Sequence, residues 1–466
     1  MKVLLVAPKV VLTGYSRLFL ETDEIGLGLL FLDAVCRKQG HETKIVLTSA
    51  AEIPSLLQEF TPDVAGITSL TPTYSEAIRI GQQLKRENPR IITVYGGHHV
   101  SALPEETLAQ ETVDYVVRGE GDEAFPLLLD ELAKGNRRPD IPGVCYTIDG
   151  KPVQTHTKAI VEDLDSLPFI DQEILENERV FIVSSRGCPF QCDFCSVGSF
   201  YERRWRKRSV ESIISELKYN DEKKQRQGKQ LTWVDFRDDN LTVDTSRLAA
   251  LCNEILKQRW EFTWHCQSRI DTAASHPELL DAMTASGCSI MALGLESGLQ
   301  EVLDTYGKGI TFAQSLEAAS LLTEKGVLHI WYAMLGCGNH LDTPEMLKRN
   351  IEAIASFPFD LLQVSLLTPF PGTPVYDRLN SQDRLLHRNW DLYDGLHCVY
   401  RPEGVEPELM DQALLWAYRK IFIQSGIRRI VHTIKCSKPF WGNTIAPLSL
   451  LKIAWDMIVM KRDLFT

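Results

Sequence analysis

The amino-acid sequence predicts an α/β protein that consists of a doubly wound parallel sheet, a partial (β/α)6 barrel and a helical C-terminal region. Three observations support this prediction. Short apolar strands alternate with amphipathic helices over the first 140 residues, a second strand–helix series begins at Val180, and the pattern of the last 60 residues is mostly helical. Such alternation is typical of parallel sheets, which hold ligands at the carboxyl ends of their strands.

The first series predicts a domain over residues 1–138, and scattered prolines after it predict a linker with a small hairpin over residues 139–178. Gly40 follows the second element as a candidate helix C-cap. The strands of this domain are predicted at Val3–Ala7, Lys44–Leu47, Val64–Thr68, Ile91–Tyr95 and Tyr115–Arg118, and its helices at Leu27–Gln39, Ile53–Phe60, Tyr74–Glu87, Pro104–Gln110 and Asp122–Ala133.

The second series predicts a barrel domain over residues 179–400, followed by a helical region over residues 401–466. Six strand–helix units fit a partial barrel better than an open sheet. Its strands are predicted at Val180–Ser185, Thr232–Arg237, Thr263–Cys266, Ser289–Leu295, His329–Leu335 and Leu362–Leu367, with helices such as Val210–Asn220 and Ser246–Gln258 between them and apolar helices at Leu414–Ile423 and Leu450–Met460.

Composition narrows the class of protein. The 466 residues carry a net charge of −12, which gives no support to a nucleic-acid-binding role. The sequence has no uncharged apolar run of 18 residues, and its first ten residues are too short an apolar run for a signal peptide. Eleven cysteines without secretory features predict a cytoplasmic protein in which clustered cysteines bind metal.

One cysteine cluster stands out. Cys188, Cys192 and Cys195 have the spacing C-x3-C-x2-C and come directly after a predicted strand. Three thiolates on a tight loop can hold three irons of a cubane and leave the fourth iron open to a chelating ligand. The alternative is zinc or a structural role, but a structural zinc site usually takes four ligands and no second C-x2-C follows in the sequence.

The cysteine motif resembles that of the radical S-adenosylmethionine (SAM) superfamily, in which an aromatic residue, here Phe194, precedes the last cysteine. The resemblance implies a [4Fe–4S] cluster on Cys188, Cys192 and Cys195. It also implies bound SAM, which an electron from a donor such as flavodoxin or ferredoxin cleaves to a 5′-deoxyadenosyl radical. The residues that the resemblance places against SAM are Phe194, Asp238, Arg269 and Glu296.

The segments after the fifth and sixth predicted strands differ in how well they match that family. Thr368–Pro374 matches the segment after the sixth barrel strand, whereas Gly336–His340 departs from the usual turn after the fifth. The resemblance therefore covers the barrel in order but leaves the role of the fifth loop open.

The N-terminal domain resembles the cobalamin-binding domain that precedes the radical domain in one large subgroup. The matching segments are Ile25–Leu30, Ser69–Tyr74, Gly96–His99 and Gly119–Glu123. The loop from Pro8 to Glu24 has no histidine that could serve as a lower axial cobalt ligand, so the alternative is a domain kept for packing. The residues that the resemblance places against cobalamin are Ser69, Leu70, Thr73, Gly96, Gly97, His98, Gly119 and Glu120.

Two basic segments leave alternatives open. The run Arg203–Arg208 is either a solvated face or a set of contacts to an anion or substrate carboxylate near the active site. The segment Arg419–Lys461, which includes Trp441 and Trp455, predicts helices that cap the core, with a peripheral membrane or lipid-substrate surface as the alternative.

Together these features predict a cobalamin-dependent radical SAM methyltransferase that acts on an unactivated carbon of a small molecule. A radical cyclase of the anaerobic magnesium-protoporphyrin ester cyclase type is the second hypothesis. A cobalamin-binding regulator without turnover is the third, although a regulator has no need of a cluster with an open iron. The sequence names no catalytic residue and no substrate.

Overall fold

The computed structural model describes residues 1–9, 25–154, 157–175, 179–421 and 424. The N-terminal sheet has seven strands in the order β2-β1-β3-β4-β5-β6-β7, of which the first five pair in parallel. Its strands are β1 Lys2–Pro8, β2 Glu42–Thr48, β3 Val64–Thr68, β4 Ile92–Gly96, β5 Tyr115–Val117, β6 Val144–Ile148 and β7 Lys151–Gln154, and its helices are α1 Leu27–Lys38, α2 Ile53–Glu59, α3 Tyr74–Glu87, α4 His98–Ala102, α5 Pro104–Leu108 and α6 Gly121–Ala133.

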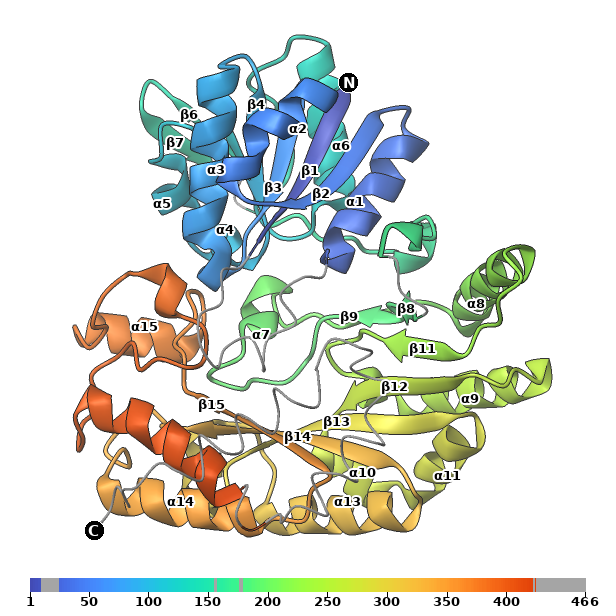
Figure 1. Ribbon diagram of the computed structural model, residues 1–466, viewed down its shortest axis with the longest axis vertical. Helices are drawn as coiled ribbons and strands as arrows, with labels where there is room; N and C mark the ends of the chain where they lie inside the picture. The colour runs from blue at the N-terminus through green and yellow to red at the C-terminus, as the bar shows by residue number, and fades with distance from the viewer. Residues whose placement is uncertain (10–24, 155–156, 176–178, 422–423, 425–466) are drawn as a thin grey trace.

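Helices cover both faces of this sheet, which explains why its strands are apolar throughout. On β1, Leu5 packs in a cluster with residues of α1 and α6, whereas Leu4 packs in a second cluster with residues of α3. A strand buried on both faces reads as a continuous apolar run rather than an alternating one. The doubly wound arrangement predicted from the sequence is confirmed (Figure 1).

The hairpin predicted within the linker exists, but it belongs to the N-terminal sheet. Strand β6 pairs antiparallel with β5, and β7 pairs antiparallel with β6. The sheet therefore extends beyond residue 138 into the segment predicted as a linker. Sequence patterns alone could not show this, because pairing with β5 is a contact between distant residues.

The second sheet is the predicted partial barrel. Its six parallel strands follow one another in the order β15-β14-β13-β12-β11-β8, so that the first and last strands lie at opposite ends of the sheet. These strands are β8 Val180–Ile182, β11 Trp233–Phe236, β12 Thr263–Ser268, β13 Cys288–Glu296, β14 Leu328–Leu335 and β15 Leu361–Leu366, and the helices include α8 Val210–Arg226, α9 Thr245–Gln258, α10 Ile270–Ser275, α11 Pro277–Ala285, α12 Gln300–Thr305, α13 Phe312–Glu324, α14 Pro344–Ser356 and α15 Pro374–Ser381.

Three small elements lie between the two sheets: β9 Ser185–Arg186, β10 Arg206–Lys207 and α7 Ser196–Phe200. Strands β9 and β10 form an antiparallel pair, and the cysteine segment runs from β9 into α7 (Figure 1). The cysteine loop is therefore placed where the two domains meet.

Residues 407–421 form a helix, so the predicted helix at Leu414–Ile423 begins earlier than expected. The predicted helix Leu450–Met460, and with it Trp441 and Trp455, lies outside the described residues. In the described part of the chain, no helix is long and apolar enough to cross a membrane.

Candidate active site at the cysteine loop

The backbone turns sharply just before the first cysteine of the motif. Gly187 has φ +85°, and a Cβ atom at this position would lie 2.0 Å from the carbonyl oxygen of Arg204. Its N–H donates to the Asp239 carboxylate at 2.9 Å. Only glycine allows this conformation at such close approach, so the sequence at residue 187 sets the direction in which the cysteine loop leaves β9.

The three cysteines of the motif are part-buried, and none of them forms a disulfide. Burial raises the pKa of Cys195 to about 12 and raises the pKa values of Cys188 and Cys192. Without a positive centre these groups stay protonated thiols. Bound metal ions deprotonate thiols outright, so this donor set is suited to a metal cofactor rather than to a free thiolate.

The thiols suit a cluster better than a single ion. In the described part of the chain, no group of three His, Cys, Asp or Glu side chains is arranged to hold one metal ion. A [4Fe–4S] cubane instead takes each thiolate on a different iron, so its ligands need not converge on one point. The alternative of a structural zinc site therefore finds no support in this geometry.

The cysteine loop is tied to distant parts of the barrel through Asp193. Its N–H donates to the carbonyl of Tyr306 at 3.0 Å, its carbonyl accepts from the N–H of Val375 at 3.2 Å, and its carboxylate accepts from Arg378 at 3.0 Å. Val375 and Arg378 belong to α15, which follows the sixth barrel strand. The loop is therefore held at both the fourth and the sixth strand–helix connections.

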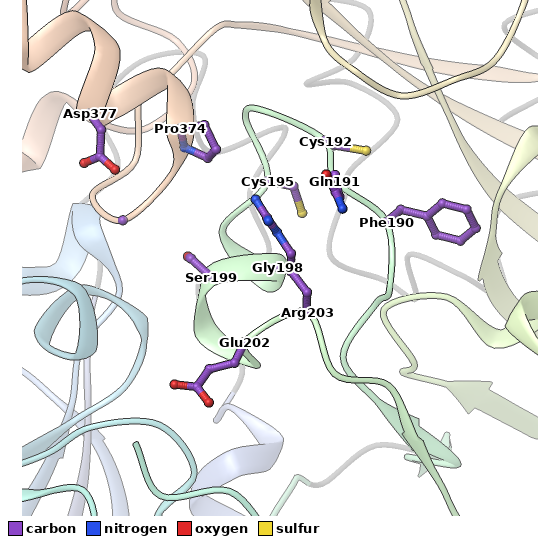
Figure 2. A pocket seen from close by; sticks show the side chains of 11 residues that line it. Phe190, Gln191, Cys192, Cys195, Gly198, Ser199, Glu202, Arg203, Pro374 and Asp377 are labelled. Atoms are coloured by element: carbon purple, nitrogen blue, oxygen red, sulfur yellow. The ribbon is translucent and has the colours of Figure 1, made fainter. Parts of the chain in front are cut away.

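A cavity of about 370 Å³ reaches the cysteines (Figure 2). It lies between the cysteine loop, α7 and the start of α15, and the figure shows Cys192 and Cys195 on its wall. Its lining residues also include Phe190, Gln191, Gly198, Ser199, Glu202, Arg203, Gly372, Pro374 and Asp377. Gly372 and Pro374 come from the stretch Thr368–Pro374, so the structure brings this predicted motif to the cysteines.

Glu296 ends β13 in a conformation that non-glycine residues rarely adopt. Its φ is +59°, and its side chain is nearly buried. The Lys308 ammonium donates to the Glu296 carboxylate at 2.6 Å and to the carbonyl of Gly294 at 2.5 Å. Backbone strain of this kind gathers at ligand sites, and the buried ion pair fixes the orientation of the carboxylate. The predicted role of Glu296 toward SAM stays a prediction that this geometry supports.

Arg269 and Phe194 also lie at the loop. The Arg269 guanidinium is 3.6 Å from the centre of the Phe190 ring and pairs with Asp271 at 2.9 Å. Phe194 meets Tyr306 edge to face at 5.4 Å. Two of the predicted SAM contacts therefore lie at the cysteine segment. Phe194 belongs to that segment, and Arg269 reaches it from the connection after the third barrel strand.

The predicted contact of Asp238 with SAM is not supported. Asp238 is buried, and its two oxygens accept hydrogen bonds from the N–H of Ser184, the hydroxyl of Ser184 at 2.8 Å and the hydroxyl of Ser185 at 2.5 Å. A carboxylate occupied in this way holds the end of β8 in place. It is a support for the strand that leads into the cysteine loop.

The loops at the carboxyl ends of β1, β3, β4 and β5 form one side of the N-terminal sheet, and we call residues 25–28, 69–73, 96–98 and 119–122 the ligand edge. Gly97, at φ +102°, allows the β4 loop to pack against Ser69, whose carbonyl would lie 2.6 Å from a Cβ at this position. Beside Gly26 and Gly28 there is open space, and Leu70 is 52% exposed. An exposed leucine and open glycine backbone leave room for a bulky planar ligand such as the corrin ring of cobalamin.

The hydroxyls of the β3 loop shape the loop itself. Both Ser69 and Thr73 hydrogen-bond to the backbone of Leu70, at 3.2 Å from the Ser69 hydroxyl to the Leu70 carbonyl and at 3.0 Å from the Leu70 N–H to the Thr73 oxygen. These two side chains therefore hold the exposed Leu70 in place, and the contacts of all three residues with cobalamin stay predictions.

Two predicted cobalamin residues have other partners in the structure. Glu120 is buried and pairs with Arg186 at 2.8 Å and with Arg206, and it also accepts from the N–H of Val161 at 2.8 Å. His98 stacks on Phe200 of α7 with ring centres 4.0 Å apart, and burial lowers its pKa to about 4. Both side chains join the N-terminal domain to the elements around the cysteine loop, so neither prediction of a cobalamin contact is supported.

The basic run Arg203–Arg208 was predicted to be either a solvated face or a set of contacts to an anion or substrate carboxylate, and the structure shows residues of different kinds within it. Arg206 and Arg208 are buried and pair with Glu120 and Glu216, whereas Arg204 forms an exposed pair with Glu162. Arg203 alone of the run lines the cavity at the cysteines. A substrate or anion contact is therefore confined to Arg203, because the other arginines already have carboxylate partners.

Sequence reasoning missed Lys308, Asp239 and Arg186. Lys308 carries no motif, since its contact with Glu296 depends on how the loop after α12 folds back. Asp239 is adjacent in sequence to the predicted Asp238, and only the structure shows that the Asp239 carboxylate accepts the hydrogen bond from Gly187. Arg186 precedes the cysteine motif directly, which was a signal that could have drawn attention to it.

Known protein families match both domains of the chain. Family models described as "B12 binding domain" and "Radical SAM superfamily" match residues 19–129 and 182–348, together more than half of the chain. An uncharacterized methyltransferase of Pyrococcus horikoshii is 28% identical over 92% of this chain and 94% of its own length. The anaerobic magnesium-protoporphyrin IX monomethyl ester cyclase of Rubrivivax gelatinosus is 27% identical over 78% of this chain and 66% of its own length.

The fold has a counterpart among solved structures. The cobalamin-dependent SAM radical enzyme OxsB, solved with aqua-cobalamin and SAM bound, superposes with a TM-score of 0.73 at 16% identity over 98% of this chain and 75% of that one. The order of domains, the cysteine motif and the two family matches agree with one another. The chain belongs to the radical SAM enzymes that carry an N-terminal B12 binding domain, with a [4Fe–4S] cluster, SAM and cobalamin as cofactors.

Proposed function

We propose that this enzyme is a cobalamin-dependent methyltransferase that acts on an unactivated carbon of a small-molecule substrate. The observation that carries the proposal is the position of the cysteine loop between the two sheets, where α7 contacts α4 of the N-terminal domain through Phe200 and His98 (Figure 1). A radical generator and a methyl carrier act on one carbon only if both are close to it. The similarity to a methyltransferase over 94% of that relative's length supports the same reaction.

The chain's own residues have defined tasks in this reaction. When bound, the cluster and SAM supply a radical that removes hydrogen from carbon, and cobalamin supplies the methyl group. Cys188, Cys192 and Cys195 hold three irons. Glu296, which accepts a hydrogen bond from Lys308, would orient the amino group of SAM, and Arg269 would stand beside the loop as a fixed positive charge. Phe190 and Phe194 limit the access of water to the cluster.

Further parts of the proposal concern the surroundings of the enzyme. We infer an external one-electron donor of the flavodoxin or ferredoxin class, because the chain has no second cysteine cluster in its sequence that could act as a relay. We also infer a cytoplasmic location, since eleven cysteines and an oxygen-sensitive cluster need a reducing compartment. The domain boundaries at residues 178 and 400 stay part of this proposal, whereas the first domain is extended from residue 138 to the end of β7, because the hairpin β6–β7 belongs to its sheet.

The test is anaerobic incubation of the reconstituted enzyme with SAM, cobalamin and a chemical reductant. Formation of 5′-deoxyadenosine together with S-adenosylhomocysteine supports methyl transfer, because one molecule of SAM yields the radical and another yields the methyl group. Cys192→Ala should remove both products. The control is Cys252→Ala, which changes a buried cysteine of α9 in the same domain and should keep both.

The relative named as a cyclase gives the second candidate function. A cyclase needs the radical but no methyl donor, so it would form 5′-deoxyadenosine without S-adenosylhomocysteine. That product pattern, measured with a substrate that increases turnover, would refute the methyltransferase proposal and leave the radical SAM assignment intact.

A further inference from the structure

A buried cluster of four charges joins the N-terminal domain to the strand that leads into the cysteine loop. Arg186 is the second residue of β9, two positions before Cys188, and Arg206 lies beside it on β10. Their carboxylate partners are Glu120 and Asp122, which precede Arg186 by 66 and 64 positions in the sequence. Glu120 pairs with both arginines, and Asp122 pairs with Arg186.

The Arg186 guanidinium is held by both carboxylates. It donates to Glu120 at 2.8 Å and to the two oxygens of Asp122 at 2.9 and 3.0 Å, and it lies 4.6 Å from the centre of the Phe31 ring. Glu120 and Asp122 belong to the ligand edge, and Phe31 belongs to α1, which starts at that edge. Arg186 therefore contacts one segment of the ligand edge, residues 119–122, and the helix that starts at another segment of it.

Burial makes this link stiff. The side chains of Arg186, Glu120 and Asp122 are 9%, 3% and 7% exposed. An ion pair removed from water cannot separate without leaving an unpaired buried charge, so its members move together. After Arg186, the left-handed conformation of Gly187 and its hydrogen bond to Asp239 restrict the backbone that leads to Cys188.

We propose that Arg186 is a positioning residue that couples the ligand edge to the cysteine loop, so that cobalamin and the cluster each strengthen the binding of the other. A ligand that orders residues 119–122 fixes Glu120 and Asp122, and through Arg186 it fixes the start of the cysteine loop. Coupling of this kind is reciprocal, so an intact cluster must tighten cobalamin binding by the same factor.

The test measures the Kd of hydroxocobalamin under anaerobic conditions for the cluster-loaded chain and for the same chain after the iron has been removed by a chelator. In the native sequence we expect cobalamin to bind the loaded chain about five-fold or more tightly. Arg186→Lys keeps the charge but loses the two-oxygen pairing with Asp122, so the ratio should fall to about one.

The matched control is Arg204→Lys, which changes an arginine of the same region whose pair with Glu162 is exposed, and it should keep the native ratio. Iron content and circular dichroism verify that each variant is folded. If Arg186→Lys does not fold, Asp122→Asn is judged by the same ratio. A native ratio of one, or a ratio that Arg186→Lys leaves unchanged, overturns the proposal. These are binding measurements, so their failure would be distinct from a failure to form methylated product.

Discussion

Gly187→Ala is the substitution whose effect the structure defines most sharply. The new Cβ would lie 2.0 Å from the carbonyl oxygen of Arg204, whereas contacts under 3.0 Å essentially never occur, so the backbone has to move by about 1 Å or more. A left-handed alanine costs about 1–2 kcal/mol, and forced displacement in a packed region adds about 1–3 kcal/mol. The displaced residue is next to Cys188, so we expect loss of iron as well as of stability.

Gly228→Ala separates these two contributions. Gly228 has φ +70°, close to that of Gly187, but a Cβ there would meet nothing within 4 Å. It should therefore show only the conformational cost of about 1–2 kcal/mol and keep its iron. The assay is iron content per chain after anaerobic reconstitution, with the thermal unfolding midpoint measured on the same samples. Equal iron content and equal midpoints in the two variants would refute the steric argument.

Three further predictions concern how burial affects ionisable side chains. Lys308→Met leaves the Glu296 carboxylate without its partner and should lower the free energy of unfolding by about 3–5 kcal/mol, and a loss below about 1 kcal/mol in denaturant titration would contradict this. Arg206→Gln should cost about 3–5 kcal/mol, whereas Arg204→Gln at the exposed pair should cost about 1 kcal/mol or less; similar losses would show that burial does not decide the effect. Burial lowers the pKa of His98 to about 4, so the unfolded chain binds the proton first as the pH falls and stability decreases from about pH 6.5 toward pH 4. His98→Phe should make that decrease shallower, as measured by unfolding midpoints across this pH range.

Local patterns were sufficient to predict most of the fold. Val64–Thr68 and Tyr74–Glu87 were predicted with the bounds that the structure has, because strand apolarity and helix periodicity are written in adjacent residues. The hairpin β6–β7 was predicted as a hairpin but assigned to a linker. Its membership of the first sheet depends on pairing with β5, which no local pattern records.

For the candidate site too, the features encoded in adjacent residues could be predicted, and those that depend on distant residues could not. The cysteine spacing identifies a cluster because the ligands of a cluster lie close together in sequence. Glu120 and Asp238 stand in segments that resemble cofactor-binding motifs, yet their carboxylates are used by Arg186 and by two serines. A motif fixes where a residue lies along the chain, whereas the partner that uses its charge comes from elsewhere in the chain.

Several contacts between the domains have a common consequence for the chemistry. The charged cluster around Arg186 holds the start of the cysteine loop, and the stacking of His98 on Phe200 holds the helix that follows the loop. A third contact lies farther away, where Trp390 donates to Glu106 at 2.8 Å and meets His99 edge to face at 4.9 Å. Separate contacts on both sides of the loop oppose rotation of one domain against the other. Under the proposed function, the sites for the methyl carrier and the radical generator would therefore keep one arrangement during the reaction.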